Sequence, residues 1–199
     1  MVQVINYGMG NIGSILNMLK KIGEGCILID NPNELRDGYN TILPGVGAFD
    51  NAMHRLNESG FSNKLRIMCQ ANTPLLGICL GMQLLGNGSE EGSMEGLKLI
   101  PGISKRFKSS ENLKIPHMGW NHVNVSDDGL YAGLEENKFY FVHSFHFVPD
   151  QVSSVLGVTS YGEDFVSSIK KENVFGAQFH PEKSHKYGMK LLKNFCAIK

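Results

Sequence analysis

Apolar and polar positions alternate regularly in the first half of the chain. Short apolar runs at residues 2–6, 26–29 and 40–43 have the length and flanking residues of buried strands. Between the first two runs, residues 11–23 place apolar side chains at helical spacing and end at a glycine, which predicts an amphipathic helix. A fourth run at 75–78 leads into another helix-like segment. Strands that alternate with helices predict a parallel sheet in an α/β domain.

The pattern changes after residue 91. Short strand-like segments separated by turn residues follow at 103–107, 121–125, 138–147, 153–160 and 165–171. A last strand is predicted at 173–180, and a helix closes the chain over 184–199. We therefore expect an α/β fold in a single domain spanning residues 1–199. It has a central mixed, mostly parallel sheet flanked by helices, and an antiparallel C-terminal extension.

Charge and cysteine content narrow the classes of function. The 19 basic residues balance the 19 acidic ones, so no electrostatic footprint indicates a nucleic acid or an anionic membrane as partner. The four cysteines form neither a zinc-binding spacing nor a Cys-x-x-Cys pair, so we expect no metal site and a reducing compartment. Neither a signal peptide nor an apolar run of about 18 residues is visible, and we expect a cytoplasmic protein.

One cysteine stands where the run at 75–78 meets the following helix. Cys79 lies within LLGICLGMQLL, close to two glycines that permit a tight turn. A strand-to-helix turn of this kind exposes a nucleophile and aims helix N–H groups at it. For an isolated cysteine, a buried free thiol that packs as a small hydrophobic side chain is the more frequent alternative. That alternative is our interpretation of Cys26, Cys69 and Cys196.

The segment FHPE supplies a base and a group to orient it. His180 and Glu182 are separated by one residue, so in an extended chain their side chains leave on the same side. A carboxylate that accepts from one ring nitrogen leaves the other free to take a proton from a thiol. Alone, this segment is equally compatible with a surface turn. Together with Cys79 it predicts a Cys-His-Glu triad, in which the helix N-terminus and the imidazolium favour the thiolate.

Acyl transfer also needs donors for the tetrahedral oxyanion. The N–H of Leu80, directly after the cysteine, is one candidate by the geometry of the turn. A second donor is expected from PGVG at 44–47, which follows the strand at 40–43 and places glycines where the backbone turns. An ordinary turn is the alternative for PGVG.

A rival interpretation starts from GMGNIG near the N-terminus. Gly8, Gly10 and Gly13 satisfy the dinucleotide fingerprint after a strand, and Asp30 follows at the distance of a ribose-binding acid. This pattern predicts a nicotinamide or flavin protein, with the pyrophosphate over the helix that begins near Asn11. The alternative is that glycines simply make a strand-to-helix turn. The dinucleotide interpretation leaves the Cys79 and QFHPE segments unexplained.

Several segments together resemble the class I (triad) glutamine amidotransferases, and more narrowly the glutaminase subunits of imidazole glycerol phosphate synthase. They are PGVGAFDNAM, GICLGMQLL, SEEG, IPHMGWN, FYFVHS and GAQFHPEKS. The resemblance covers essentially the whole chain. It implies a flavodoxin-like amidotransferase domain without a cofactor. It also implies hydrolysis of L-glutamine to glutamate and ammonia through a thioester on Cys79, with His180 as general acid and base and Glu182 as its orienter.

The resemblance also implies residues around the substrate. The glutamine-binding site would be lined by Gly47, Gln83, Glu91, His143, Ser144 and Phe145. Leu80 and the Val46/Gly47 peptide would serve the oxyanion. Many relatives carry tyrosines where this chain has Phe145 and His146, which removes a hydroxyl at Phe145.

A partner is implied as well. Ammonia would pass to a (β/α)8-barrel cyclase subunit, in a heterodimer that serves histidine biosynthesis. The isolated subunit would be nearly idle, because the oxyanion loop is misaligned until partner and acceptor bind. Residues expected to face the partner are Asn11, Met118, Gly119, Trp120 and Asn121. Similar subunits supply ammonia for sugar amidination in surface polysaccharide synthesis, and the shared motifs do not separate the two pathways.

Overall fold

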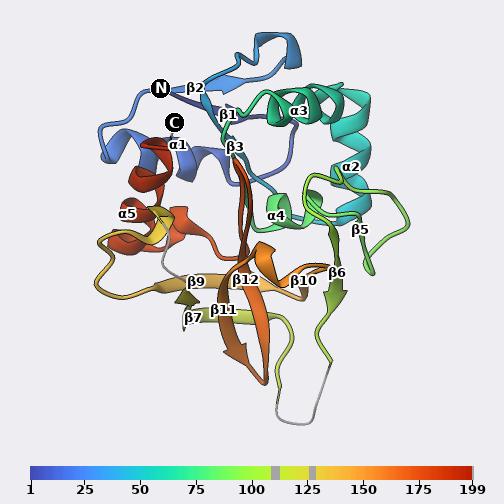
Figure 1. Ribbon diagram of the computed structural model, residues 1–199, viewed down its shortest axis with the longest axis vertical. Coiled ribbons are helices and arrows are strands. Elements are labelled where there is room, and N and C mark those ends of the chain that lie inside the picture. The colour runs from blue at the N-terminus through green and yellow to red at the C-terminus, as the bar shows by residue number, and fades with distance from the viewer. Residues whose placement is uncertain (109–112, 126–128, 199) are drawn as a thin grey trace.

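The computed structural model describes residues 1–108, 113–125 and 129–198, and it shows an α/β fold with a mixed central sheet (Figure 1). Its parallel part contains β1 (Val2–Ile5), β2 (Cys26–Ile29), β3 (Asn40–Leu43), β4 (Leu75–Ile78) and β13 (Val174–Ala177). These strands lie in the order β2-β1-β3-β4-β13 and pair in parallel. This is the flavodoxin-like order, and in such sheets ligands bind beyond the carboxyl ends of the strands.

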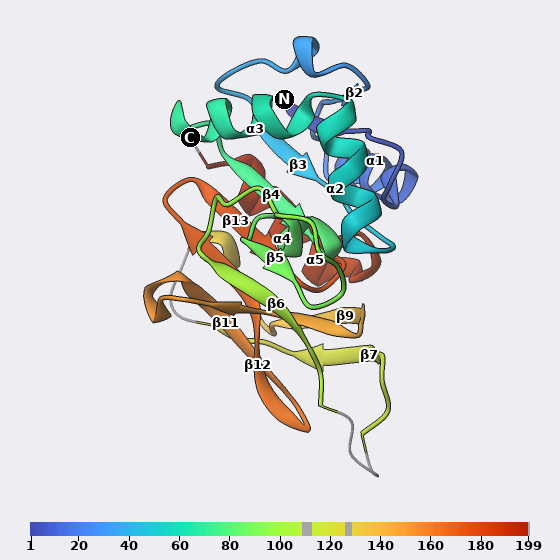
Figure 2. The ribbon, with the colours of Figure 1, turned by 90° about the vertical axis from the view of Figure 1, so that its right-hand side faces the viewer.

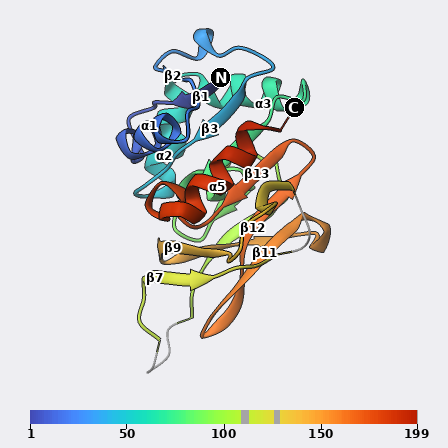
Figure 3. The ribbon, with the colours of Figure 1, turned by 90° about the vertical axis from the view of Figure 1, so that its left-hand side faces the viewer.

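Helices cover both faces of the parallel strands, which explains why these strands are mostly apolar. One face carries α1 (Ile12–Lys21) and α5 (His185–Cys196), which lie in front in Figure 3. The other carries α2 (Phe49–Glu58), α3 (Phe61–Gln70) and the short α4 (Leu80–Leu84), which lie in front in Figure 2. Two clusters of buried side chains fill the space between sheet and helices, one on each face.

The apolar pattern predicted the parallel strands and the helices that flank them on one face. The bounds expected for β2, β3 and β4 are confirmed, and the helix expected at 11–23 is α1. The helix expected at 184–199 is α5, although residue 199 lies outside the described residues. The pattern gave no element for residues 49–70, where α2 and α3 bury amphipathic faces against the sheet.

Antiparallel strands extend the sheet in the second half of the chain, as expected. They are β6 (Gly102–Arg106), β8 (Asn124–Val125), β10 (Phe145–Pro149), β11 (Val155–Tyr161) and β12 (Glu163–Lys171). The short β5 (Gly88–Ser89) pairs in parallel with β6 at the edge. Short 3-10 turns connect several elements: η1 (Pro32–Glu34), η2 (Gly129–Tyr131), η3 (Val152–Ser154) and η4 (Pro181–Lys183). The last strand, β13, returns to the parallel part of the sheet. It pairs in parallel with β4 and antiparallel with β12.

One expectation for the second half is wrong. The apolar stretch 138–147 predicts one strand-like segment, but the chain bends at Ser144 and forms two strands in different sheets. Strand β9 (Lys138–His143) pairs with β7 (His117–His122) in a separate two-stranded sheet, whereas β10 joins the main sheet. The hydrophobic pattern alone does not tell which partner strand each half will find.

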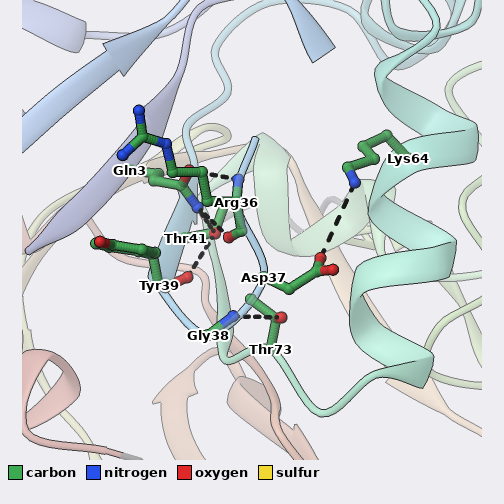
Figure 4. A network of polar contacts seen from close by, with 8 residues as sticks. All are labelled: Gln3, Arg36, Asp37, Gly38, Tyr39, Thr41, Lys64 and Thr73. Carbon is green, nitrogen blue, oxygen red and sulfur yellow. Dashed lines mark hydrogen bonds and ion pairs between the residues drawn. The ribbon is translucent and has the colours of Figure 1, made fainter. Parts of the chain in front are cut away.

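A closed polar network ties the connection between β2 and β3 to the sheet (Figure 4). Gln3 is 1% exposed, and its Nε2 donates to the Arg36 carbonyl at 2.9 Å and to Thr41 Oγ1 at 3.2 Å. Its Oε1 accepts from the Arg36 N–H at 2.8 Å. The side chain of Gln3 therefore holds a loop that lies outside the strands of the sheet.

Candidate active site

Cys79 occupies the sharp turn between β4 and α4. Its backbone is left-handed, at φ 55° and ψ −112°, which is unusual for a residue with a side chain. The chain passes so closely here that a Cβ on Gly81 would collide with the carbonyl oxygen of Leu43. A Cβ on Gly77 would lie 2.5 Å from the carbonyl oxygen of Gly81. The turn expected from the sequence is therefore present, although α4 is only five residues long.

His180 and Glu182 follow β13, the strand that pairs in parallel with β4. Both side chains thus lie near the carboxyl ends of neighbouring strands, on the same side as Cys79. The His180 Nδ1 donates to Glu182 Oε1 at 2.8 Å, and the two residues are 1% and 8% exposed. The backbone N–H of His180 donates to the Tyr140 carbonyl at 2.8 Å, which fixes the segment against β9.

Two atoms of this pair are buried and have no hydrogen-bond partner among the described residues. They are His180 Nε2 and Glu182 Oε2. Burial alone would lower the pKa of His180, but the neighbouring Cys79 sulfur and the Glu182 carboxylate outweigh it and raise that pKa to about 10. The ring is therefore held as an imidazolium at neutral pH, with one N–H left over beside a cysteine.

A second side chain approaches the sulfur. Gln178 is fully buried, and its Nε2 lies 3.9 Å from Cys79 Sγ. Its Oε1 accepts from Gln83 Nε2 at 3.0 Å, which fixes the amide in that orientation. No role for Gln178 followed from the sequence, although the residue stands within the quoted segment GAQFHPEKS.

The expected substrate residues line one cavity of about 320 Å³ next to the cysteine. Its walls contain Cys79 and His180 together with Val46, Gly47, Leu80, Gln83, Glu91, His143, Ser144 and Phe145. Val142 and Lys183 also line it and were not predicted from the sequence. The structure thus brings together residues that are far apart in the sequence, while their individual roles stay predictions.

Hydrogen bonds inside this cavity show what two of these side chains already do. Gln83 Nε2 donates to the Phe145 carbonyl at 3.0 Å as well as to Gln178, so both amide hydrogens are engaged. Glu91 Oε2 accepts from the Phe49 N–H at 2.9 Å, at the first residue of α2. Both side chains therefore hold the cavity walls in place.

The glycine-rich loop that suggested a dinucleotide packs against protein. A Cβ on Gly10 would lie 2.7 Å from the Cβ of Pro44, and one on Gly47 would lie 2.9 Å from the Met9 side chain. Asp30, the expected ribose ligand, accepts a hydrogen bond from the Asn6 amide at 2.6 Å. Close approach to the PGVG turn accounts for Gly10, whereas a Cβ on Gly8 would meet the Arg55 side chain and one on Gly13 would meet no atom within 4 Å. Among the described residues, no group of three or more histidine, cysteine or acidic side chains could hold a metal ion.

Of the residues expected to face a partner, two on β7 are clearly exposed. Met118 and Trp120 are 62% and 41% exposed, and they alternate with the buried His117. The Trp120 ring stacks on His185 at a centroid distance of 5.5 Å. Gly119, Asn121 and Asn11 are half-buried, and Asn11 directly precedes α1. In the described part of the chain, no helix has the length and apolar character needed to span a membrane.

Comparisons with known proteins agree with the fold. The family described as glutamine amidotransferase class-I matches residues 3–198. The chain is 48% identical over 198 residues to "Imidazole glycerol phosphate synthase subunit HisH 2" of Methanococcus maripaludis, covering 98% of each chain. It is 45% identical over 202 residues to the protein of the same name in Pseudomonas aeruginosa, covering all of both chains.

Solved structures show the same fold at lower identity. A structure titled "Crystal structure of glutamine amidotransferase" superposes with a TM-score of 0.77 at 18% identity, over 98% of this chain and 97% of that one. The structure of PurLQS from Thermotoga maritima gives a TM-score of 0.75 at 18% identity, over 98% and 96% of the two chains. The chain belongs to the class-I glutamine amidotransferase family, among relatives of the HisH type.

Proposed function

We propose that this chain is the glutaminase subunit of an imidazole glycerol phosphate synthase, and that it hydrolyses L-glutamine to glutamate and ammonia with Cys79, His180 and Glu182. The observation that carries the proposal is the buried Nε2 of His180, at the wall of a cavity of about 320 Å³ beside Cys79. Within the described parts of the chain this nitrogen has no hydrogen-bond partner. An imidazolium whose free N–H faces a thiolate is the ion pair that cysteine acyl transfer requires.

The proposed reaction proceeds in two halves. The Cys79 thiolate attacks the amide carbon of glutamine, and the Leu80 N–H and the Val46/Gly47 peptide stabilise the oxyanion. The His180 imidazolium then gives its proton to the leaving nitrogen, so ammonia departs and a thioester remains. Neutral His180 next takes a proton from water, whose oxygen attacks the thioester and releases glutamate and the thiolate. Glu182 keeps the ring in one orientation throughout.

The ammonia needs an acceptor enzyme. We propose a (β/α)8-barrel cyclase subunit as partner, forming a heterodimer in the cytoplasm. The names of the relatives support a subunit of this synthase, and the exposed Met118 and Trp120 on β7 support a docking face. Met118 pairs with Val142, which lines the cavity, and contiguous exposed apolar side chains are typical of protein interfaces.

The test is a glutaminase assay with and without the cyclase subunit of the same organism and its nucleotide ligand. We expect weak activity alone and an increase of about a hundredfold or more in the complex. Trp120→Ala should weaken association by roughly tenfold or more, as truncation of a buried interface aromatic does. Val152→Ala is the matched control, because Val152 is an 87% exposed apolar residue on η3. Equal activity with and without partner would contradict the proposed assembly.

A separate experiment tests whether the ammonia serves histidine biosynthesis. Complementation of a histidine auxotroph that lacks its own glutaminase subunit should restore growth. Active glutaminase without complementation would instead indicate the alternative acceptor, a sugar-amidinating enzyme of surface polysaccharide synthesis.

A further inference from the structure

We propose that His117 is a positioning residue for the glutamine pocket, which it shapes through His143 by fixing the carbonyl of Phe145. This inference rests on the proposed function, since it assigns the pocket to glutamine. His117 lies on β7, is 2% exposed and does not line the cavity. It reaches the cavity only through the ring of His143, which does line it.

The direction of this hydrogen-bond chain follows from the last acceptor. His143 Nδ1 lies 2.8 Å from the Phe145 carbonyl oxygen, and a carbonyl only accepts, so Nδ1 carries the proton. The Nε2 of neutral His143 is then an acceptor. The His117 Nδ1 lies 3.0 Å from that Nε2 and must donate to it. Each ring is thereby assigned one tautomer, with its proton on Nδ1.

The surroundings keep both rings neutral and fixed. Burial lowers the pKa of His117 to about 4 and that of His143 to about 3. The His117 ring is stacked between Phe141 and Tyr161, at centroid distances of 4.8 and 4.0 Å. Its Nε2 lies 3.4 Å from Asn121 Nδ2, which also donates to the Ser160 carbonyl at 2.9 Å. This series of hydrogen bonds therefore begins on β7, the strand that exposes Met118 and Trp120.

The carbonyl at the end of this chain holds the bend in the cavity wall. It accepts from His143 on β9 and from Gln83 on α4, so two elements grip the same oxygen. Ser144, at the bend, and Phe145 both line the cavity. Loss of the His117 donor leaves the acceptor Nε2 of His143 buried and unpaired, so the ring is no longer held in place and its Nδ1–H no longer fixes the Phe145 oxygen. The bend would then shift without any change in the triad.

Kinetics of matched variants test the proposal in the complex with the cyclase subunit. His117→Phe keeps a stacked ring but removes the donor, whereas His117→Asn places an amide N–H near the original Nδ1. We expect His117→Phe to raise the KM for glutamine roughly tenfold to a hundredfold, with kcat within about threefold, because the substitution weakens ground-state binding of the substrate. His117→Asn should stay within about threefold of wild type. His54→Phe, at an exposed position on α2, is the control.

Nitrogen-15 NMR of the histidine rings tests the hydrogen bonds from His117 to His143 and from His143 to Phe145 without an activity measurement. Wild-type protein should show His117 and His143 neutral at pH 7 and protonated at Nδ1, and in His117→Phe the resonance of the unprotonated His143 Nε2 should shift because it loses its donor. Wild-type rings protonated at Nε2 would overturn the proposal, as would an unchanged KM in His117→Phe. An equal loss of glutaminase activity in His117→Phe and His117→Asn, together with slower alkylation of Cys79 by iodoacetamide, would also overturn the proposal. Wild-type protein without glutaminase activity would instead refute the proposed function, and the NMR signals would still test the chain.

Discussion

The buried polar group around Gln3 and the one around His180 lie in the same sheet but differ in how completely they are bonded. At Gln3, near the start of β1, both the donor and the acceptor end of the amide are paired with protein. At the carboxyl ends of β4 and β13, His180 Nε2 and Glu182 Oε2 find no partner in the part of the chain that the structure describes. Buried polar groups are normally satisfied, so an exception next to a cavity indicates bonding capacity kept for a ligand. We therefore expect the first group to stabilise the fold and the second to take part in the proposed reaction.

The largest effect is expected at the nucleophile. Cys79→Ala should reduce glutaminase activity by about 10⁴-fold or more, because no other group can form the thioester. Cys69→Ala is the matched control, since Cys69 is an equally buried thiol whose pKa burial raises to about 12. Steady-state ammonia release measures both variants. A Cys79→Ala protein with activity within tenfold of wild type would contradict the proposed mechanism.

The next effect is expected at the orienting carboxylate. Glu182→Gln should reduce kcat by roughly 10²- to 10⁴-fold, because the ring loses its charged acceptor and its fixed orientation. The carboxylate raises the pKa of His180, so its removal should lower that pKa. Both effects appear in the pH dependence of kcat/KM, where the alkaline limb of the variant should move to lower pH. An unchanged alkaline limb would count against the Glu182 contact as its cause.

The same pKa shift predicts how stability depends on pH. A histidine whose pKa is raised on folding contributes stability that is complete below the unfolded value of about 6.5 and is lost as pH rises toward the folded value. For His180 the folded value is about 10. Urea unfolding of wild type should therefore show this contribution declining between pH 6.5 and 10. In Glu182→Gln the decline should be smaller.

At Gln3 we expect a loss of stability with little loss of activity, the opposite of the result expected at Cys79. Gln3→Leu should lower the free energy of unfolding by about 1–3 kcal/mol, because the Arg36 N–H and carbonyl lose their buried partner. Glutaminase activity should stay within about threefold of wild type. Urea unfolding and the ammonia assay test the two halves of this prediction. A large loss of activity in a folded variant would show that the two polar groups are not independent.

The smallest effect is expected at the edge of the Gln3 network. Lys64 Nζ lies 3.9 Å from Asp37 Oδ1 (Figure 4), and the Asp37 side chain is 61% exposed. Lys64→Ala should change the free energy of unfolding by less than about 0.5 kcal/mol, because water and salt screen exposed ion pairs. Urea unfolding at low and high salt measures it. A loss above about 1 kcal/mol would mean that the pair does more than its exposure suggests.

The sequence predicted the parallel half of the fold better than the antiparallel half, for a physical reason. A strand covered on both faces tends to be a continuous apolar run, as β4 is, so β4 could be located from the apolar pattern alone. The bend at Ser144 depends on the His143 ring reaching the Phe145 carbonyl and on which sheet each strand joins. Neither depends on the local pattern of apolar residues.

The candidate site divides in the same way. His180 and Glu182 are close in sequence, and Cys79 stands at a recognisable turn, so the amino-acid pattern was enough to single out all three. Gln178 and His117 could not be found in this way, because their hydrogen bonds join residues that are 95 or 26 positions apart. Roles of this kind depend on the assembled fold.

The bend between β9 and β10 has a mechanical consequence. One uninterrupted stretch of backbone belongs to the small β7-β9 sheet on one side of Ser144 and to the main sheet on the other. The small sheet joins the main sheet a second time at Val123, where β7 leads into β8 and β8 pairs with β11. The cavity wall at Ser144 and Phe145 therefore lies at one of these junctions, so its shape depends on how the two sheets are oriented relative to each other.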